Sequence, residues 1–137
     1  HYGSNNMQTT QKFAKSKNVI WITVISSAEG KQGYIQPNDA VNTFASFGSF
    51  PDHILVDENG DLGKKFNAKT TPHIFIADKN KNIVYQGAID DAGGSRFWTT
   101  DLNQSTNFVK KVINDIKSNK PLSVSKTRPY GCSVKYG

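Results

Sequence analysis

The sequence is short of sulfur, of charge and of long hydrophobic runs. Of its 137 residues, one is cysteine, Cys132, and one is methionine. A single thiol excludes a disulfide within the chain. No apolar run approaches membrane-spanning length, and none resembles a signal peptide. The hydrophobic share of 36% and the charged share of 20% are a little below the usual values and predict one compact domain with polar connections.

Several common site motifs are also missing. His1, His53 and His73 do not have the spacing of metal ligands. The acidic run at 57–61 lacks the acidic residue that closes a calcium loop, and the glycines at 30–33 lack the Gly-Lys-Ser/Thr ending of a phosphate-binding loop. We therefore predict neither a metal site nor a cofactor.

The charge of the chain is uneven. Residues 1–60 carry four Lys and Arg against five Asp and Glu, whereas residues 61–137 carry thirteen against six. A basic half can bind nucleic acid or an anionic membrane. Here the lysines are scattered through turns and one helix, with no interleaved aromatic pattern, so we predict a solvated surface and no nucleic-acid or membrane partner.

Hydrophobic periodicity predicts alternating helices and strands. The near-continuous apolar run 19–25 predicts a strand covered on both faces and central in the sheet. Helical spacing in the second predicted helix points Val41, Phe44 and Ala45 inward. This order predicts an α/β sandwich with a mixed sheet, as one domain over 1–137 with a tail over 121–137. The predicted helices lie from 4 or 5 to 17, at 38–47, at 62–66, and from 105 or 106 to before Pro121. The predicted strands lie at 19–25, 53–57, 74–78 and 83–87, with a loop at 91–104.

The most distinctive stretch is Thr70-Thr71-Pro72-His73 with the hairpin that follows it. A proline is tolerated at the mouth of a strand because the first ladder position can lack an N–H donor. The residue before it, Thr71, is pushed towards extended geometry. On these residues alone a trans bond before Pro72 is favoured.

This stretch and several others together resemble the thioredoxin-like, peroxiredoxin-related (redoxin) family. The resemblance implies a thioredoxin-like fold that lacks its first strand, and a cis Thr71–Pro72 bond facing the reactive cysteine. In that family a Cys-Pro motif stands a few residues before a Lys-His-Tyr sequence, so the nucleophilic cysteine is expected upstream of His1. The stretches that carry the resemblance are His1-Tyr2, Trp21, Ser26-Ser27, 30–34, Asp57, Gly60, 70–73, 87–91 and 129–136.

Cys132 is the catalytic candidate in this chain, as a resolving or redox-sensitive thiol. The alternative, a small residue packed against the sheet, is the commoner role of a free cysteine. Thr71, Pro72 and His73 are the substrate-binding candidates. His73 could hydrogen-bond a thiolate or substrate, but a histidine satisfied by the backbone is favoured.

The resemblance implies a thiol-dependent oxidoreductase that reduces peroxides or protein disulfides in an antioxidant role and takes electrons from a thiol donor. The 137-residue chain alone is expected to be inactive, because it lacks the nucleophile. The alternative is a non-catalytic thioredoxin-fold module for binding or assembly. An unpaired edge of strand 19–25 would also favour a homo-oligomer through β-pairing. Bacterial cytoplasm and periplasm both remain open as compartments.

Overall fold

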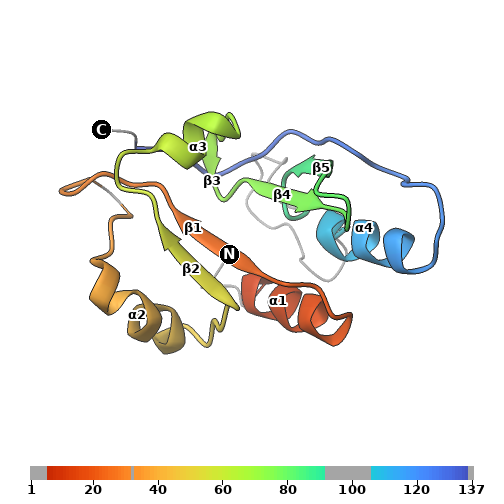
Figure 1. Ribbon diagram of the computed structural model, residues 1–137, viewed down its shortest axis with the longest axis horizontal. Coiled ribbons are helices and arrows are strands. Elements are labelled where there is room, and N and C mark those ends of the chain that lie inside the picture. Colours follow the sequence, from red (N-terminus) through yellow and green to blue (C-terminus); the bar gives the residue numbers. More distant parts are fainter. Residues whose placement is uncertain (1–5, 32, 92–105, 136–137) are drawn as a thin grey trace. The chain divides into compact units, whose positions relative to one another are not determined.

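The computed structural model describes residues 6–31, 33–91 and 106–135. Most of the loop predicted at 91–104 therefore lies outside the described residues. The chain divides into two compact units, His1–Ala68 with Ser133–Gly137, and Lys69–Cys132. The elements are α1 (Asn6–Ser16), β1 (Ile22–Ile25), a 3-10 helix (Pro37–Asp39), α2 (Ala40–Ser46), β2 (His53–Val56), α3 (Asp61–Lys65), β3 (Thr70–Thr71), β4 (Ile74–Ala77), β5 (Ile83–Gly87), α4 (Phe108–Lys117) and β6 (Cys132–Ser133) (Figure 1).

A parallel strand pair forms the centre of the first unit. β1 pairs with β2 from Ile22 opposite His53 to Ile25 opposite Val56. Side chains alternate between the two faces of a strand, so one face of the pair carries Ile25, Ile54 and Val56 toward α2. The core on this face consists of Ile25, Ala40 and Phe44, with the half-buried Ile35, Ile54 and Val56 packed against it.

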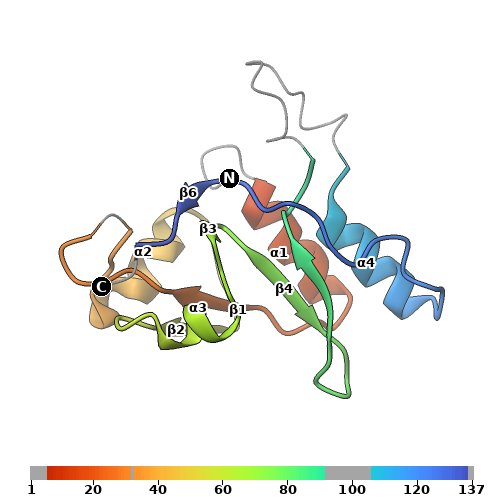
Figure 2. The same cartoon turned by 90° about the horizontal axis from the view of Figure 1, so that it is seen from above.

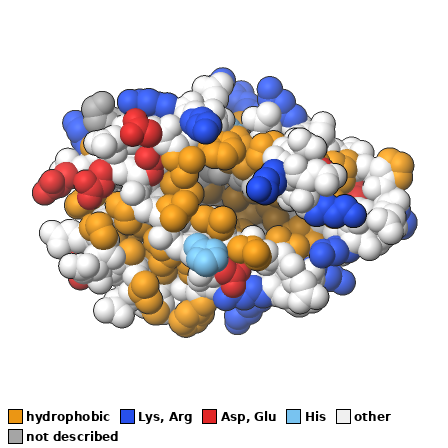
Figure 3. Space-filling view, in the orientation of Figure 1, with side chains coloured by type: hydrophobic (Ala, Val, Ile, Leu, Met, Phe, Trp, Pro, Cys, Tyr) orange, Lys and Arg blue, Asp and Glu red, His pale blue; other side chains and the backbone are white. Residues whose placement is uncertain are grey.

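The opposite face of the pair is exposed, and this corrects the prediction for strand 19–25. Ile22 is 53% exposed, Val24 39% and Leu55 45%. Among the described residues β1 pairs with β2 alone, so it is an edge strand and is not central in a sheet. An apolar run indicates strand propensity but does not reveal how many strands flank it. Figure 3 shows hydrophobic side chains at the surface on one face of the molecule, beside charged ones.

β1 is also shorter than predicted because the preceding residues end α1. Asn18 has a left-handed φ of 59°. The Val19 amide donates to the Ala14 carbonyl oxygen at 3.0 Å, which closes the last turn of the helix. Residues 19–21 therefore lead from the helix into the strand.

Buried polar side chains join α1 to the segment after α2. Gln8 Nε2 donates to the Phe47 carbonyl oxygen at 2.6 Å. Gln11 Oε1 accepts from Ser49 Oγ at 2.9 Å and from the Phe50 amide at 3.3 Å. These hydrogen bonds satisfy polar groups that would otherwise be costly to bury.

Asp57 connects the end of β2 to α3. Its carboxylate accepts from Ser26 Oγ at 2.8 Å and from the amides of Leu62 and Gly63 at 3.1 Å and 2.9 Å. Burial alone would raise the pKa of Asp57, but these hydrogen bonds, with one from the Asp61 amide, outweigh it and lower the pKa. The carboxylate therefore caps the short helix.

The second unit contains the predicted hairpin. β4 and β5 are antiparallel, with Ile74 opposite Gly87 and a register shift between Ile76 and Ala77. The Asp78 carboxylate accepts from the amides of Asn80 and Asn82 at 2.9 Å and 3.0 Å, which fixes the turn. The hairpin prediction is confirmed.

α4 is the amphipathic helix that the apolar stripe predicted. Its Val109, Val112 and Ile113 are buried. Asn107 is the N-cap, where Ser105 or Thr106 was predicted, and its side chain accepts from the Lys110 amide at 2.9 Å. Asn suits an N-cap as well as Ser does, so composition alone could not choose between adjacent polar residues.

The structure is mixed α/β, and the strands among its described residues form three two-stranded sheets. The Thr71–Pro72 bond is cis, as the resemblance implied. No described helix is long and apolar enough to cross a membrane. The thioredoxin-like fold and the single domain with its tail stay predictions.

Phe44→Ala tests the core of the first unit. Phe44 is 6% exposed, whereas Val41 on the same helix is 68% exposed, contrary to the prediction that it faces inward. We expect Phe44→Ala to lower the free energy of unfolding by about 3 to 5 kcal/mol. The control Val41→Ala should change it by about 0.5 kcal/mol or less. Urea unfolding measures both, and equal losses would mean that the core is placed incorrectly.

Candidate functional site

Pairing between β3 and β6 brings the Thr71–Pro72 bond beside the C-terminal tail (Figure 2). Gly131 lies directly against Thr71. A Cβ atom at Gly131 would overlap the Thr71 carbonyl oxygen and lie 3.3 Å from Pro72 Cδ. Three of the predicted site residues, Thr71, Pro72 and Cys132, are therefore neighbours. The sequence suggested Thr71 and Pro72 through one motif and Cys132 separately, and it gave no sign of this pairing.

Cys132 is exposed. A thiol that is packed against a sheet would be covered, so the packing alternative does not describe Cys132, and its role as a resolving or redox-sensitive thiol stays a prediction. Because it follows Gly131 directly, Cys132 lies at the Thr71–Pro72 turn and is open to solvent reagents.

His73 has structural partners. Its Nδ1 accepts from the Lys69 amide at 3.2 Å. Its ring stacks on Phe75, with 4.4 Å between the ring centroids. Burial, with the nearby positive charge of Lys69, lowers the pKa of His73. The interpretation as a backbone-satisfied histidine is confirmed, and the neutral ring keeps its N–H on Nε2.

A hydrogen-bonded junction at Thr127 fixes the tail on β5. Thr127 Oγ1 accepts from the Ala88 amide at 2.9 Å and lies 2.6 Å from the hydroxyl of the buried Tyr85. The Tyr85 hydroxyl donates to the Ala88 carbonyl oxygen at 2.5 Å. The Thr127 amide donates to the Gln86 carbonyl oxygen at 3.0 Å. The hydroxyls of Tyr85 and Thr127 and the amides of Ala88 and Thr127 therefore all have partners.

Two further features hold the tail in place. The Tyr130 hydroxyl donates to the carboxylate of Asp90, which is 1% exposed. Gly87 leaves room for Thr127, because a Cβ at Gly87 would overlap the Thr127 side chain. The tail is thus fixed at Thr127 and Tyr130 before it reaches Cys132.

Thr70 supports the turn from within. Its Oγ1 donates to the Pro72 carbonyl oxygen at 2.8 Å. Across the described parts of the chain, no group of three or more His, Cys, Asp or Glu side chains could hold a metal ion.

The same fold occurs in two solved bacterial structures. An uncharacterized conserved protein from Geobacillus kaustophilus superimposes with a TM-score of 0.77 at 19% identity, over 98% of this chain and 70% of that one. A hypothetical protein from Sinorhizobium meliloti 1021 gives a TM-score of 0.76 at 18% identity, over 96% of this chain and 70% of that one. No protein-family model and no curated protein matches this sequence. At these identities the likeness concerns the fold alone.

Gly131→Ala tests the contact between the tail and β3. Gly131 has a φ of +140°, and its added Cβ would overlap backbone. Gly30→Ala is the control, because Gly30 has a φ of +78° with nothing within 4 Å of the added atom. Both should lose about 1 to 3 kcal/mol of stability from backbone strain. Gly131→Ala should lose about 1 kcal/mol or more in addition, and equal losses in urea unfolding would contradict the contact.

His73→Gln tests the histidine environment. The folded-state pKa of His73 lies below the ordinary value of 6.5, so the unfolded chain takes up the proton first as pH falls. This contribution to stability is present above about pH 6.5 and is lost as pH falls through the folded-state pKa. Between about pH 7.5 and about pH 5.5, the native chain should lose more stability than His73→Gln. Identical profiles for the native chain and His73→Gln would refute the assignment.

Proposed function

We propose that this chain is part of a thiol-dependent oxidoreductase of the thioredoxin and peroxiredoxin type, with Cys132 as the resolving thiol. The nucleophilic cysteine would come from residues before His1 in the longer protein. Its substrate would be a peroxide or a protein disulfide. The observation that carries the proposal is an exposed Cys132 beside the cis Thr71–Pro72 bond.

The position of the tail supports a thiol exchange. In the family that the sequence resembles, the cis proline faces the reactive cysteine, and the backbone of the residue before it pairs with substrate. Here β6, which begins with Cys132, pairs with β3, which ends with Thr71. The tail therefore lies beside Thr71, the residue before the cis proline. This arrangement presents Cys132 as an internal exchange partner.

The proposed reaction has two steps within the protein. The upstream thiolate attacks a peroxide oxygen, the O–O bond breaks, and a sulfenic acid forms as water or an alcohol leaves. The Cys132 thiolate then attacks the sulfenic sulfur, an S–S bond forms, and hydroxide leaves as water. A thiol electron donor returns the two electrons by reducing that disulfide. Pro72 would shape the groove in which the two sulfur atoms meet.

A second candidate is a non-catalytic module for binding or assembly. The observation in its favour is the exposed apolar face of β1 and β2, with Ile22, Val24 and Leu55 at its surface. Strand pairing on β1, whose described partner is β2 alone, would add main-chain hydrogen bonds. A cysteine in the native sequence before His1 favours the oxidoreductase, and its absence favours this module.

Cys132→Ser in the full-length protein tests the proposed function. With one equivalent of hydrogen peroxide, the native protein should form one internal disulfide that includes Cys132. Cys132→Ser should stop at a sulfenic acid that dimedone traps, because no second thiol attacks it. Ser133→Ala, an exposed neighbour on the same strand, should behave as the native protein does. Peptide mass spectrometry distinguishes these products.

The 137-residue chain is a further control. It contains one thiol and should show no insulin-disulfide or peroxide turnover above its Cys132→Ser variant. A full-length protein without an upstream cysteine, or a disulfide that leaves Cys132 out, would overturn the proposed role.

A further inference from the structure

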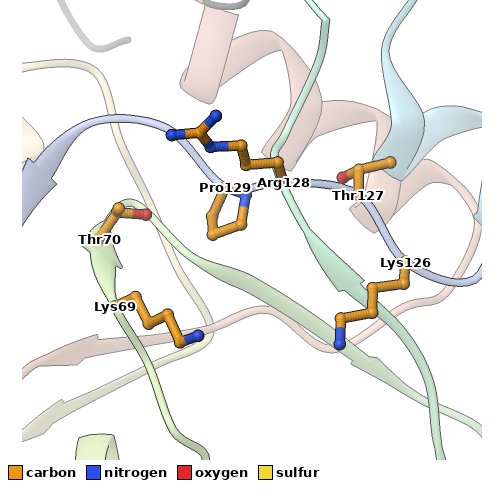
Figure 4. Close-up of a pocket in the computed structure, with 6 residues that line it drawn as sticks. All are labelled: Lys69, Thr70, Lys126, Thr127, Arg128 and Pro129. Carbon is orange, nitrogen blue, oxygen red and sulfur yellow. The ribbon is translucent and has the colours of Figure 1, made fainter.

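A hollow in the second unit gathers basic side chains that are far apart in the sequence. Its volume is about 650 Å³, and it is lined by Lys69, Thr70, Lys126, Thr127, Arg128 and Pro129. Figure 4 shows Lys69 just before β3 and Thr70 at its first position, with Lys126 to Pro129 on the tail. Sites for small molecules are commonly of this size. We call this feature the basic hollow.

The six residues that line the basic hollow carry positive charge and include no carboxylate. Three of its six lining residues are Lys or Arg, and none is acidic. The ion pair recorded within the described ranges joins Lys15 to Asp52 in the first unit, so it involves none of these three cations. Residues 69–132 as a whole carry ten Lys and Arg against five Asp and no Glu. Positive charges around one hollow repel one another, and a bound anion would relieve this repulsion.

The backbone that carries these charges is fixed before any ligand arrives. Thr127 holds the tail through Tyr85 and Ala88, and Lys126 and Arg128 are its immediate neighbours. Thr70, next to Lys69, is held by its bond to the Pro72 carbonyl oxygen at 2.8 Å. A fixed backbone reduces the ordering that binding would require.

We propose that the basic hollow binds a small phosphate-bearing molecule. A phosphomonoester carries close to two negative charges at neutral pH, which matches three cations better than a single carboxylate does. Figure 4 shows the guanidinium of Arg128 on the other side of the tail from the ammonium groups of Lys69 and Lys126, so binding requires these exposed side chains to turn toward the ligand. The planar guanidinium can then bind two phosphate oxygens, with the two lysines as point charges. No residue lining the hollow is aromatic, so the stacking platform of single-stranded nucleic-acid sites is absent from it.

This proposal is independent of the thiol chemistry, because no residue that lines the hollow is a cysteine. The sequence predicted a solvated basic surface, since its lysines are scattered along the chain. Only folding brings Lys69 to the tail, 57 or more positions away in the numbering. The cluster of positive charge could therefore not be predicted from the sequence.

The test is a titration of the full-length protein with inorganic phosphate and with O-phosphoserine, at constant ionic strength set by chloride. Both should raise the melting temperature in a saturable way, and isothermal calorimetry should give a dissociation constant. Arg128→Gln and Lys126→Gln should each weaken phosphate binding by about tenfold or more. In heteronuclear NMR, the amides of Thr70 and Thr127 should shift during the titration.

The matched controls are Lys79→Gln and Lys81→Gln. Both lysines are exposed and lie in the turn between β4 and β5 of the same unit. Each substitution therefore removes one positive charge away from the basic hollow. They should leave the phosphate affinity within about twofold. If all four variants weakened phosphate binding equally, the affinity would depend on net charge alone, and the proposed site would be wrong. A melting shift no larger than that of chloride, or tighter binding of single-stranded oligonucleotides than of O-phosphoserine, would overturn it as well.

Discussion

The candidate site depends on the hydrogen bonds made by the hydroxyl of Thr127. It accepts from the Ala88 amide and bonds the hydroxyl of Tyr85, which is fully buried. Without it, two buried polar groups would lose a partner, at a cost of about 1 to 3 kcal/mol each. The junction also sets the position of the residues on either side of it. The tail can therefore carry chemistry, because its backbone is tied to β5.

The parts of the fold that sequence could predict are those encoded locally. The stripe of α4 and the two β-rich runs around the Asp78 turn depend on residues within a few positions of one another. Their hydrogen bonds, such as Asn107 Oδ1 to the Lys110 amide, are equally local. The burial of β1 was predicted wrongly because it depends on neighbouring strands, which are distant in the chain. Hydrophobicity alone could not show that one face of β1 stays exposed.

In the candidate site, too, the locally encoded residues could be predicted and the contacts between distant segments could not. Thr71 and Pro72 were found from a local motif and a family resemblance, and the cis bond agrees with that prediction. The place of Cys132 could not be predicted, because it requires two strands of two residues each to pair. Such strands carry no periodic signal. The hydrogen bond from Tyr130 to Asp90 spans 40 positions and has no sequence signature either.

One segment carries both proposed activities, and this affects how they can be separated. Lys126 and Arg128 flank the Thr127 junction, whereas Cys132 follows Gly131 at β3. A substitution at Thr127 would loosen both ends of the tail and would affect anion binding and thiol exchange together. Arg128 and Cys132 are exposed and make no hydrogen bond at the junction. Substitutions at these two positions therefore change one function each while the junction that positions both remains intact.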